Sequence, residues 1–367
     1  TSYTEAGSPI TQTGITPGTV TDPMSGGVIN PISTYPYPDF KPERTKSYEV
    51  GINARFLNGR ISFDGTFYQS NTYNQTFLSV MSPATGYSGF YVQAGNVRNR
   101  GVEMTLGYND TFGKVNYSTH LTYTANQNKI VEMVHDYRNP IDNSLVNITE
   151  LTLKEVGDVY LREGYSMSDV FTTGILQRGR DGKLVEEGNG YQVDRSQRIR
   201  LGSADPDFTM GWRHDINYKN ISLGLMITGR FGGIVTSQTQ AFMDAFGVSK
   251  VSAEARDNGG VMLDGHRYDA ERYYNTVGGQ GLMSYYTYDA TNVRLQELSL
   301  TYSLPKRWLG DVFNNATISF VGRNLFMFYR KAPFDPDMNG STGTYNRSDF
   351  FMAPSLRNLG FSIKFSL

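Results

Sequence analysis

The sequence predicts an all-β protein, an antiparallel transmembrane β-barrel segment of about nine to eleven strands with long extracellular loops and short periplasmic turns. Apolar and polar residues alternate with period two over most of the chain. The connections between these segments are alternately short and long along the sequence. The final segment places Phe361, Ile363, Phe365 and Leu367 on one face, and no further residues follow to cover them. In a barrel, lipid acyl chains cover such a face.

The composition restricts the alternatives. The 367 residues are 38% apolar and carry a formal net charge of −1, with a mean hydropathy of −0.42. No segment approaches the roughly 20 consecutive apolar residues of a membrane helix, but a barrel strand exposes only alternate residues to lipid and needs no such run. The near-neutral charge gives no indication of nucleic-acid binding. The 25 Tyr and 21 Phe suit aromatic girdles at the membrane interfaces.

Nine segments alternate clearly enough to be predicted as strands. Asn58-Gly59, a strong hairpin signal, and Lys219-Asn220 separate two pairs of them. The stretch 136–207 could hold two more. The nine segments are 48–56, 61–68, 102–108, 115–125, 208–218, 221–228, 298–304, one that begins at Ile318, and 361–367.

The connections define an orientation. Short turns are predicted at 58–59, 110–113, 219–220 and 305–315, and the long stretches between them are 78–90, 136–207, 236–285 and 331–354. Outer-membrane barrels have short turns on the periplasmic side and long loops outside. The outer membrane is therefore the expected location, with a periplasmic C-terminus and with Trp308, beside Lys306 and Arg307, as a periplasmic interface anchor.

Two parts of the chain are expected. Residues 1–44 contain seven of the fourteen prolines and are predicted to be an extracellular loop segment. Residues 45–367 are predicted to be the C-terminal part of a transmembrane barrel. Because two unpaired sheet edges are not tolerated in lipid, we expect further barrel strands upstream of this chain.

The strand phase predicts which charged residues face the barrel lumen. His214 falls on the outward phase, as an exception that the pattern does not explain. The residues predicted to line a substrate path are Arg55, Asp64, Glu103, His120, Arg213 and Asp215.

The segment Asp335-Pro-Asp-Met-Asn-Gly340 has the spacing of the start of a calcium loop. Its weak candidate ligands are Asp335, Asp337 and Asn339, but position twelve is Asn346 instead of a bidentate Glu, so an ordinary polar turn is the favoured interpretation. We expect no other cofactor or metal. No motif for a catalytic nucleophile, phosphate loop or zinc protease occurs, so we expect no catalytic residues and no enzyme activity.

Several segments, in order, resemble the C-terminal half of the barrel of SusC/RagA-type TonB-dependent outer-membrane transporters of the Bacteroidetes. They are KPERTKSYEVG (41–51), NVRNRGVEMTL (96–106), ADPDFTMGW (204–212), ARDNGG (255–260), ATNVRLQELSLTYSLP (290–305), VGRNLFMF (321–328) and APFDPD (332–337).

The resemblance implies a 22-stranded barrel that imports oligosaccharides or oligopeptides. Family members contain a plug domain and a TonB box N-terminal to the part that this chain resembles, and we expect both to lie outside it. The partners implied are the rest of the barrel with its plug, a SusD-like surface lipoprotein that acts as a lid, the TonB complex acting through the plug, lipid and lipopolysaccharide, and a glycan or peptide substrate. Two alternatives stay open: a passive outer-membrane porin, and a secreted β-rich adhesin that binds glycans.

The long loop 236–285 then has two interpretations. Its polar and aromatic residues could contact the lid or a substrate, or they could fold the loop onto itself. The candidates are Arg256, Asp257, Asn258, Tyr273, Tyr274, Tyr285 and Tyr286.

Overall fold

A computed structural model describes residues 34, 40–80, 87, 89–138, 144–153, 159–309, 313–337 and 348–366. Most of the predicted loop segment 1–44, and Asn339 of the candidate calcium loop, lie outside these residues. The chain divides into two compact units, which are described in turn. Unit 1 comprises residues 1–49, 68–100 and 127–169, and unit 2 comprises residues 50–67, 101–126 and 170–367.

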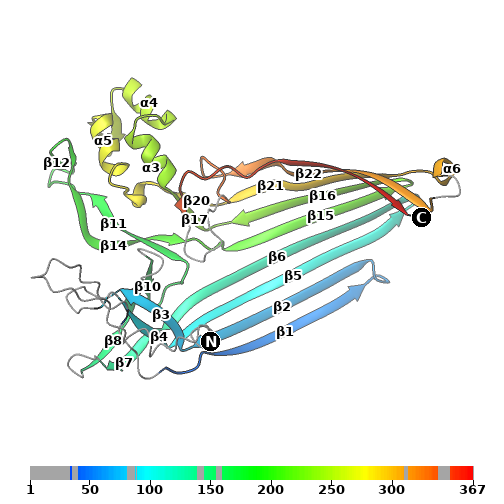
Figure 1. Ribbon diagram of the computed structural model, residues 1–367, viewed down its shortest axis with the longest axis horizontal. Coiled ribbons are helices and arrows are strands. Elements are labelled where there is room, and N and C mark those ends of the chain that lie inside the picture. Colours follow the sequence, from blue (N-terminus) through cyan, green and yellow to red (C-terminus); the bar gives the residue numbers. More distant parts are fainter. Residues whose placement is uncertain are drawn as a thin grey trace, which may run out of the picture. The chain divides into compact units, whose positions relative to one another are not determined.

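Nine long strands form one sheet in which the order of the strands is the order of the chain (Figure 1). From β6 to β24 every described pairing in this sheet is antiparallel. These are the nine strands that the alternation predicts. They are β1 (Arg44–Phe56), β2 (Ile61–Tyr73), β5 (Asn96–Phe112), β6 (Val115–Glu132), β15 (Phe208–Tyr218), β16 (Ile221–Phe231), β21 (Asn292–Ser303), β22 (Asn315–Arg330) and β24 (Asn358–Ser366).

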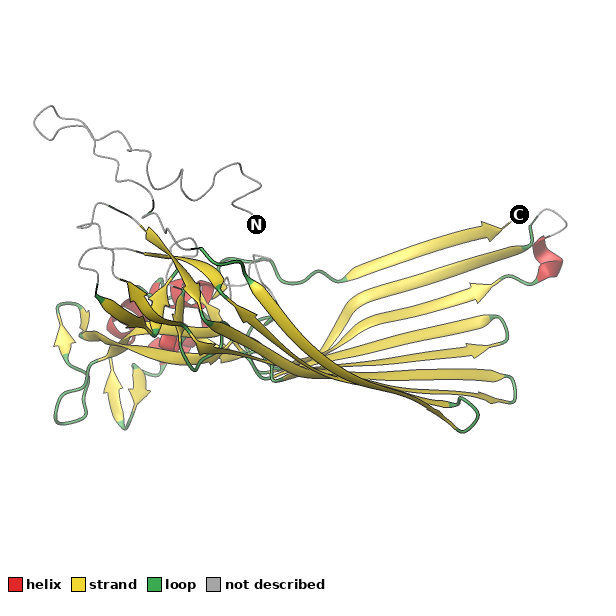
Figure 2. Cartoon of the chain, turned by 90° about the horizontal axis from the view of Figure 1, so that it is seen from below, coloured by secondary structure: helices red, strands yellow, loops and turns green. Residues whose placement is uncertain are grey.

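Tight turns join neighbouring strands at one end of the sheet. Leu57, Asn58 and Gly59 all have positive φ, which the Asn-Gly pair tolerates and which closes the β1–β2 hairpin. Lys219, with φ of 52°, makes the same kind of turn before β16. The helix α6 (Lys306–Leu309) lies in the connection between β21 and β22 (Figure 2), and its Trp308 is exposed beside the guanidinium of Arg307.

The apolar face of the sheet is uncovered in the structure. Phe361, Ile363 and Phe365 of the last strand are 67%, 49% and 61% exposed. The same holds for Ile52 and Leu300 on other strands. Among the described residues, no second protein layer covers these alternate side chains, and the fold is an all-β barrel segment, as predicted. Within the described residues, no helix combines the length and apolarity needed to cross a bilayer.

Residues 136–207 contain several strands, but the described ones pair among themselves outside the nine-stranded sheet. In unit 2, β11 (Asp169–Leu176) pairs with β14 (Val193–Ser203), and β12 (Glu186–Glu187) pairs with β13 (Gly190–Tyr191). The described residues of this stretch therefore add no strand to the nine-stranded sheet.

The long connections of unit 2 fold into a body with its own core, which we call the loop body (residues 170–203, 234–289 and 348–351). It contains three eight-residue helices, α3 (Gln238–Ala245), α4 (Lys250–Asp257) and α5 (Ala270–Val277). The sequence analysis did not predict them. The loop body also contains β17 (Ile234–Ser237), β18 (Val261–Leu263), β19 (His266–Tyr268), the 3₁₀ turn η2 (Met283–Tyr285) and β20 (Thr287–Asp289), and β17 pairs with β23 (Ser348–Asp349).

Each of the three helices begins at a capping side chain. Ser237 accepts a hydrogen bond from the Gln240 amide, Ser249 accepts one from Ser252, and Asp269 accepts one from Arg272. Such caps satisfy amide groups that have no partner within the helix. Helices of this length are marginal in isolation, so packing in the loop body has to stabilise them.

Unit 1 holds the remaining hairpins and a smaller core. Its hairpins are β3 (Gln75–Val80) with β4 (Gly89–Ala94), β7 (Val134–Arg138) with β8 (Leu145–Ile148), and β9 (Glu150–Thr152) with β10 (Tyr160–Arg162). Val92, Ile130, Met133 and Leu161 are almost completely buried. Unit 1 also contains the ends of β1, β2, β5 and β6.

Candidate functional site

The polar face of the sheet carries the predicted substrate-path residues in unit 2. Arg213 of β15 lies opposite His120 of β6 in the register. Its guanidinium donates two hydrogen bonds to Asp215, at 2.8 and 2.9 Å. The structure therefore brings three of the six predicted residues into one cluster on neighbouring strands.

The other three predicted residues lie on the neighbouring strands β1, β2 and β5. Asp64 of β2 accepts a hydrogen bond of 2.9 Å from the Asn53 amide of β1. Arg55 and Glu103 are exposed, and no ion pair is found for either among the described residues. Their side chains are thus free for other contacts, whereas Asp64 is already partnered. Their role as substrate-path residues stays a prediction.

A glycine next to the Arg213–Asp215 pair keeps the polar face open. A Cβ atom at Gly224, the register partner of Asp215, would lie 2.5 Å from the Ser299 hydroxyl and 3.4 Å from the Asp215 carboxylate. Only glycine leaves these polar side chains in place at this point.

Sequence reasoning missed a second charge pair on the same face. Glu297 of β21 accepts a hydrogen bond of 3.0 Å from Arg323 of β22. The register between these strands shifts between Leu295 and Glu297, and such a β-bulge interrupts a strict period of two. The alternation around Glu297 was the available signal, but its partner depended on the bulge.

His214 is the polar residue that the strand phase places on the outward, apolar face, and the structure explains this position. Its Nδ1 lies 2.8 Å from the Tyr117 hydroxyl, and its ring is 4.3 Å from that of Trp212. The Trp212 indole in turn donates to the Thr119 hydroxyl at 3.0 Å. The polar atom of His214 is thus partnered within an aromatic cluster near the short turns, as interface residues are.

The candidate calcium loop contains an internal cation. The guanidinium of Arg294, 6% exposed, lies 2.8 Å from Asp335 and 2.7 Å from Asp337. Burial is the largest influence on the Asp335 carboxyl and raises its pKa, but hydrogen bonds from Ser355 and Arg294 outweigh it and hold the pKa below its ordinary value. The acidic residues are therefore neutralised by the chain itself, and calcium binding stays a prediction.

The tyrosines predicted to contact a lid or substrate lie in the loop body. Tyr273, Tyr274 and Tyr286 are buried in its core. Tyr285 is half-buried, and its hydroxyl accepts a hydrogen bond of 3.1 Å from the Leu176 amide. Burial raises the pKa of the Tyr273 and Tyr286 hydroxyls, so both stay protonated at neutral pH.

The other three predicted loop residues lie at the end of α4 and are exposed. Arg256 donates to the Gly247 carbonyl at 2.8 Å, and the Asn258 carbonyl accepts from Arg267. Asp257 lies between them in sequence. The structure thus separates the loop candidates into buried tyrosines that hold the fold and exposed polar residues that can reach a partner.

Beside α3, the loop body exposes an aromatic patch, which sequence reasoning missed. We define it as Phe242, Phe246, Phe350 and Phe351, all of which are exposed. The Phe242 ring lies 6.0 Å from Phe350 and 5.7 Å from Phe351. Asp349, buried beside them, accepts a hydrogen bond of 2.7 Å from the Ser237 hydroxyl and so fixes the segment that carries two of the rings. The separation of these residues in sequence left no signal.

A sheet with one lipid-type face, one polar face and large ordered loops defines the class: a β-barrel segment of an outer-membrane transport protein. The family model TonB dependent receptor-like, beta-barrel, matches residues 1–228, and the chain belongs to this family.

Two curated relatives come from Formosa agariphila. The chain is 25% identical to its TonB-dependent receptor P3, covering 94% of this chain and 36% of the relative, and 25% identical to its TonB-dependent receptor P26, covering 82% and 32%. This chain thus spans about a third of their length. Among solved structures, the RagAB peptide transporter has the same fold, with a TM-score of 0.64 and 16% identity over 91% of this chain and 36% of that one.

Proposed function

We propose that the chain is part of a TonB-dependent active importer in the outer membrane, with its C-terminus in the periplasm. It supplies barrel wall, lumen lining and outer loops, and it makes no covalent change to its cargo. The observation that carries the proposal is the division of the sheet into a lipid-type face and a polar face with the Arg213–Asp215 cluster. TonB acts through a plug domain outside this chain, as the family membership supports.

The cargo that we propose is an oligopeptide, with an oligosaccharide as the second candidate. Charges of both signs line the polar face, in the pairs Arg213–Asp215 and Glu297–Arg323, and peptides carry charges of both signs. The name of the RagAB peptide transporter supports the same choice.

We further propose that a SusD-like surface lipoprotein docks on the aromatic patch of the loop body. Contiguous exposed aromatic side chains mark interaction surfaces. Deleting residues 236–285 would also remove part of the core, so point variants are the sharper test. Phe246→Ser with Phe350→Ser should reduce co-purification of the lipoprotein at least tenfold, while Leu145→Ser, at another exposed apolar position, should leave it unchanged.

Uptake of labelled oligopeptides by cells tests the proposed activity. Arg213→Gln with Asp215→Asn should lower uptake several-fold at equal surface level, since both charges of the path are lost. A protonophore should abolish uptake by the unmodified protein. Uptake that persists with the protonophore would instead identify a passive porin, and protein recovered in the soluble medium would identify an adhesin.

A further inference from the structure

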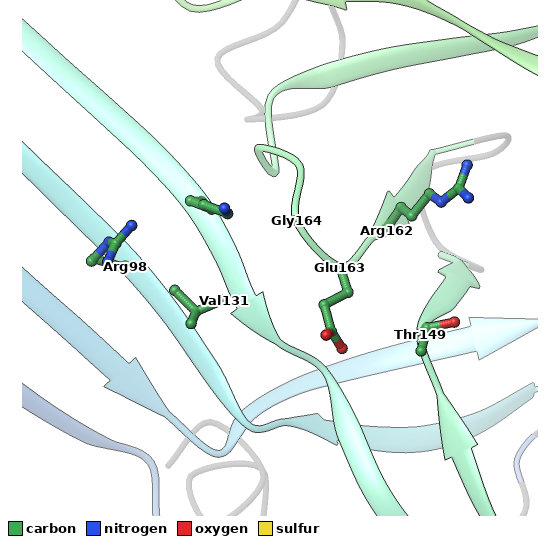
Figure 3. Close-up of a pocket in the computed structure, with 7 residues that line it drawn as sticks. Arg98, Val131, Thr149, Arg162, Glu163 and Gly164 are labelled. Carbon is green, nitrogen blue, oxygen red and sulfur yellow. The ribbon is translucent and has the colours of Figure 1, made fainter.

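Unit 1 contains a basic pocket of about 560 Å³ that the proposed transport path does not use. Figure 3 shows Arg98 on one side of this pocket and Glu163 and Thr149 on the other. The lining residues are Arg98, Lys129, Val131, Thr149, Arg162, Glu163 and Gly164. Three side chains are cationic and one is acidic, so the pocket favours an anion.

Two of the cations have no hydrogen-bond or ion-pair partner among the described residues. Glu163 accepts a hydrogen bond from the Met133 amide and lies 3.8 Å from His135. Arg162 lies 3.9 Å from Glu150. Neither Arg98 nor Lys129 has a hydrogen bond or ion pair within the part of the chain that the structure describes, although both are half-buried. Half-buried cations without a counter-charge are costly unless an anion reaches them.

The strand phase places these two cations on the outward face. On the inward phase, Asn128 donates to Asn99. The next pair towards the short turn is Arg100, which donates to Gln127. These two contacts give the register of β5 and β6 here, with residue 99 opposite 128 and residue 100 opposite 127. Nearer the turn, Thr111 and Asn116 hydrogen-bond in the same register, so no residue is inserted between these points and the phase is preserved. Arg98 therefore shares the face of the exposed Met104 and Leu106, further along β5.

The position along the strand matches a membrane interface. Ten residues of β5 separate Arg98 from Tyr108, which lies near the short turns. That is about 34 Å along a strand, or about 26 Å along the membrane normal at a tilt of about 40°, and the apolar band of such barrels is about 25 Å tall. With Tyr108 at one headgroup region, this spacing would put Arg98 and Lys129 at the other. On the same phase, Lys46 of β1 lies over the Tyr73 ring.

We infer that this pocket binds a phosphate group of outer-leaflet lipopolysaccharide, held mainly by Arg98 and Lys129 with Arg162 in support. Guanidinium and ammonium groups are the side chains that recognise phosphate. The lipid source follows from the outward phase, because cargo in the lumen does not meet this face. The inference depends on the barrel lying in the outer membrane and not on its cargo, so peptide uptake can fail while this inference stands.

The test uses the full-length transporter in nanodiscs that contain either bisphosphorylated or dephosphorylated lipid A. The melting temperature should be several degrees higher with the phosphorylated lipid. Arg98→Gln with Lys129→Gln should remove this difference, and Arg98→Lys should keep most of it. The matched control, Lys114→Gln with Arg180→Gln, removes the same charge at exposed positions that do not line the pocket and should keep the whole difference.

Heat-modifiable migration on gels checks that every variant is folded. Equal melting temperatures with the two lipids, or a double variant that keeps the difference, would overturn the inference. If millimolar inorganic phosphate reproduces the shift in lipid without phosphate groups, the source is free phosphate and the assignment to lipid is wrong.

Discussion

The nine-stranded sheet and the loop body use aromatic and aliphatic residues in opposite ways. In the sheet, apolar side chains such as Phe361 and Ile52 are exposed and the polar groups pair on the other face. In the loop body, Leu282 and Tyr286 are buried among helices and short strands, as in a water-soluble domain. Within unit 2, the strands therefore follow the pattern of a protein folded in lipid, with apolar side chains outside, and the loop body follows the pattern of a protein folded in water, with apolar side chains inside.

The two regions also differ in what stabilises them. The sheet has regular backbone pairing over long strands, whereas the loop body depends on a few buried contacts between distant segments. The Tyr268 hydroxyl, for example, accepts a hydrogen bond of 3.1 Å from the Leu184 amide, 84 positions away. Single substitutions should therefore separate the regions by their effect.

The largest effect is expected for Arg294→Ala. It leaves Asp335, whose side chain is 10% exposed, without its cation, whereas the more exposed Asp337 keeps Arg230 at 3.8 Å. Removing one partner of a buried pair costs about 3–5 kcal/mol. Hydrogen exchange of the segment around Asp335 and the midpoint of denaturant unfolding measure the loss. Arg323→Ala breaks an ion pair whose arginine is exposed, and about 0–1 kcal/mol is expected. Equal losses for the two variants would contradict the distinction between buried and exposed pairs.

Adjacent positions of the last strand test the lipid face. Phe361→Arg should destabilise the transporter in lipid by up to about 2–4 kcal/mol, because a charge on the lipid face has to lie in hydrocarbon. Ser362→Arg, one position along on the polar face, should cost less than half as much. Unfolding titrations in lipid vesicles compare them. If the two arginines are tolerated equally, the face with Phe361 is in water and the barrel assignment fails.

The sequence was sufficient for the sheet because each strand carries its own pattern. All nine strands, the turn at Asn58-Gly59 and the outward phase of Phe361 could be predicted from a period of two. The lengths of β5 and β6 could not, since their outer ends at residues 96–101 and 126–132 lose the clear alternation of apolar and polar residues. The two strands are linked there by side-chain hydrogen bonds as well, from Asn128 to Asn99 and from Arg100 to Gln127.

The loop body could not be predicted from the sequence, for a physical reason. Its core joins residues from two loops, such as Leu184 and Leu282, and no local pattern links them. The caps Ser237, Ser249 and Asp269 were the available signal for helices. The candidate polar residues on the sheet were found by phase, while Arg323 and the aromatic patch required the three-dimensional arrangement.

Acid should weaken the loop side through Asp335. Because the pKa of Asp335 is lower in the folded protein than in the unfolded chain, its contribution to stability is complete above the unfolded value of about 3.9. This contribution is lost as the pH falls through the folded value. Asp335→Asn should therefore weaken the dependence of the melting temperature on pH below about 4. The same pH dependence in both proteins would show that another carboxylate is responsible.

A small effect is expected at His214, on the outward face of the sheet. Tyr117→Phe removes the hydroxyl that lies 2.8 Å from His214, and the unpaired ring nitrogen should cost about 0.5–1.5 kcal/mol. The control is Tyr123→Phe, because the Tyr123 ring stacks on Phe208. It should leave the unfolding midpoint almost unchanged. Adding His214→Phe to Tyr117→Phe should restore most of the loss, because both partners are then apolar. A double variant as unstable as Tyr117→Phe alone would mean that packing against Trp212, and not the hydrogen bond, accounts for the histidine on this face.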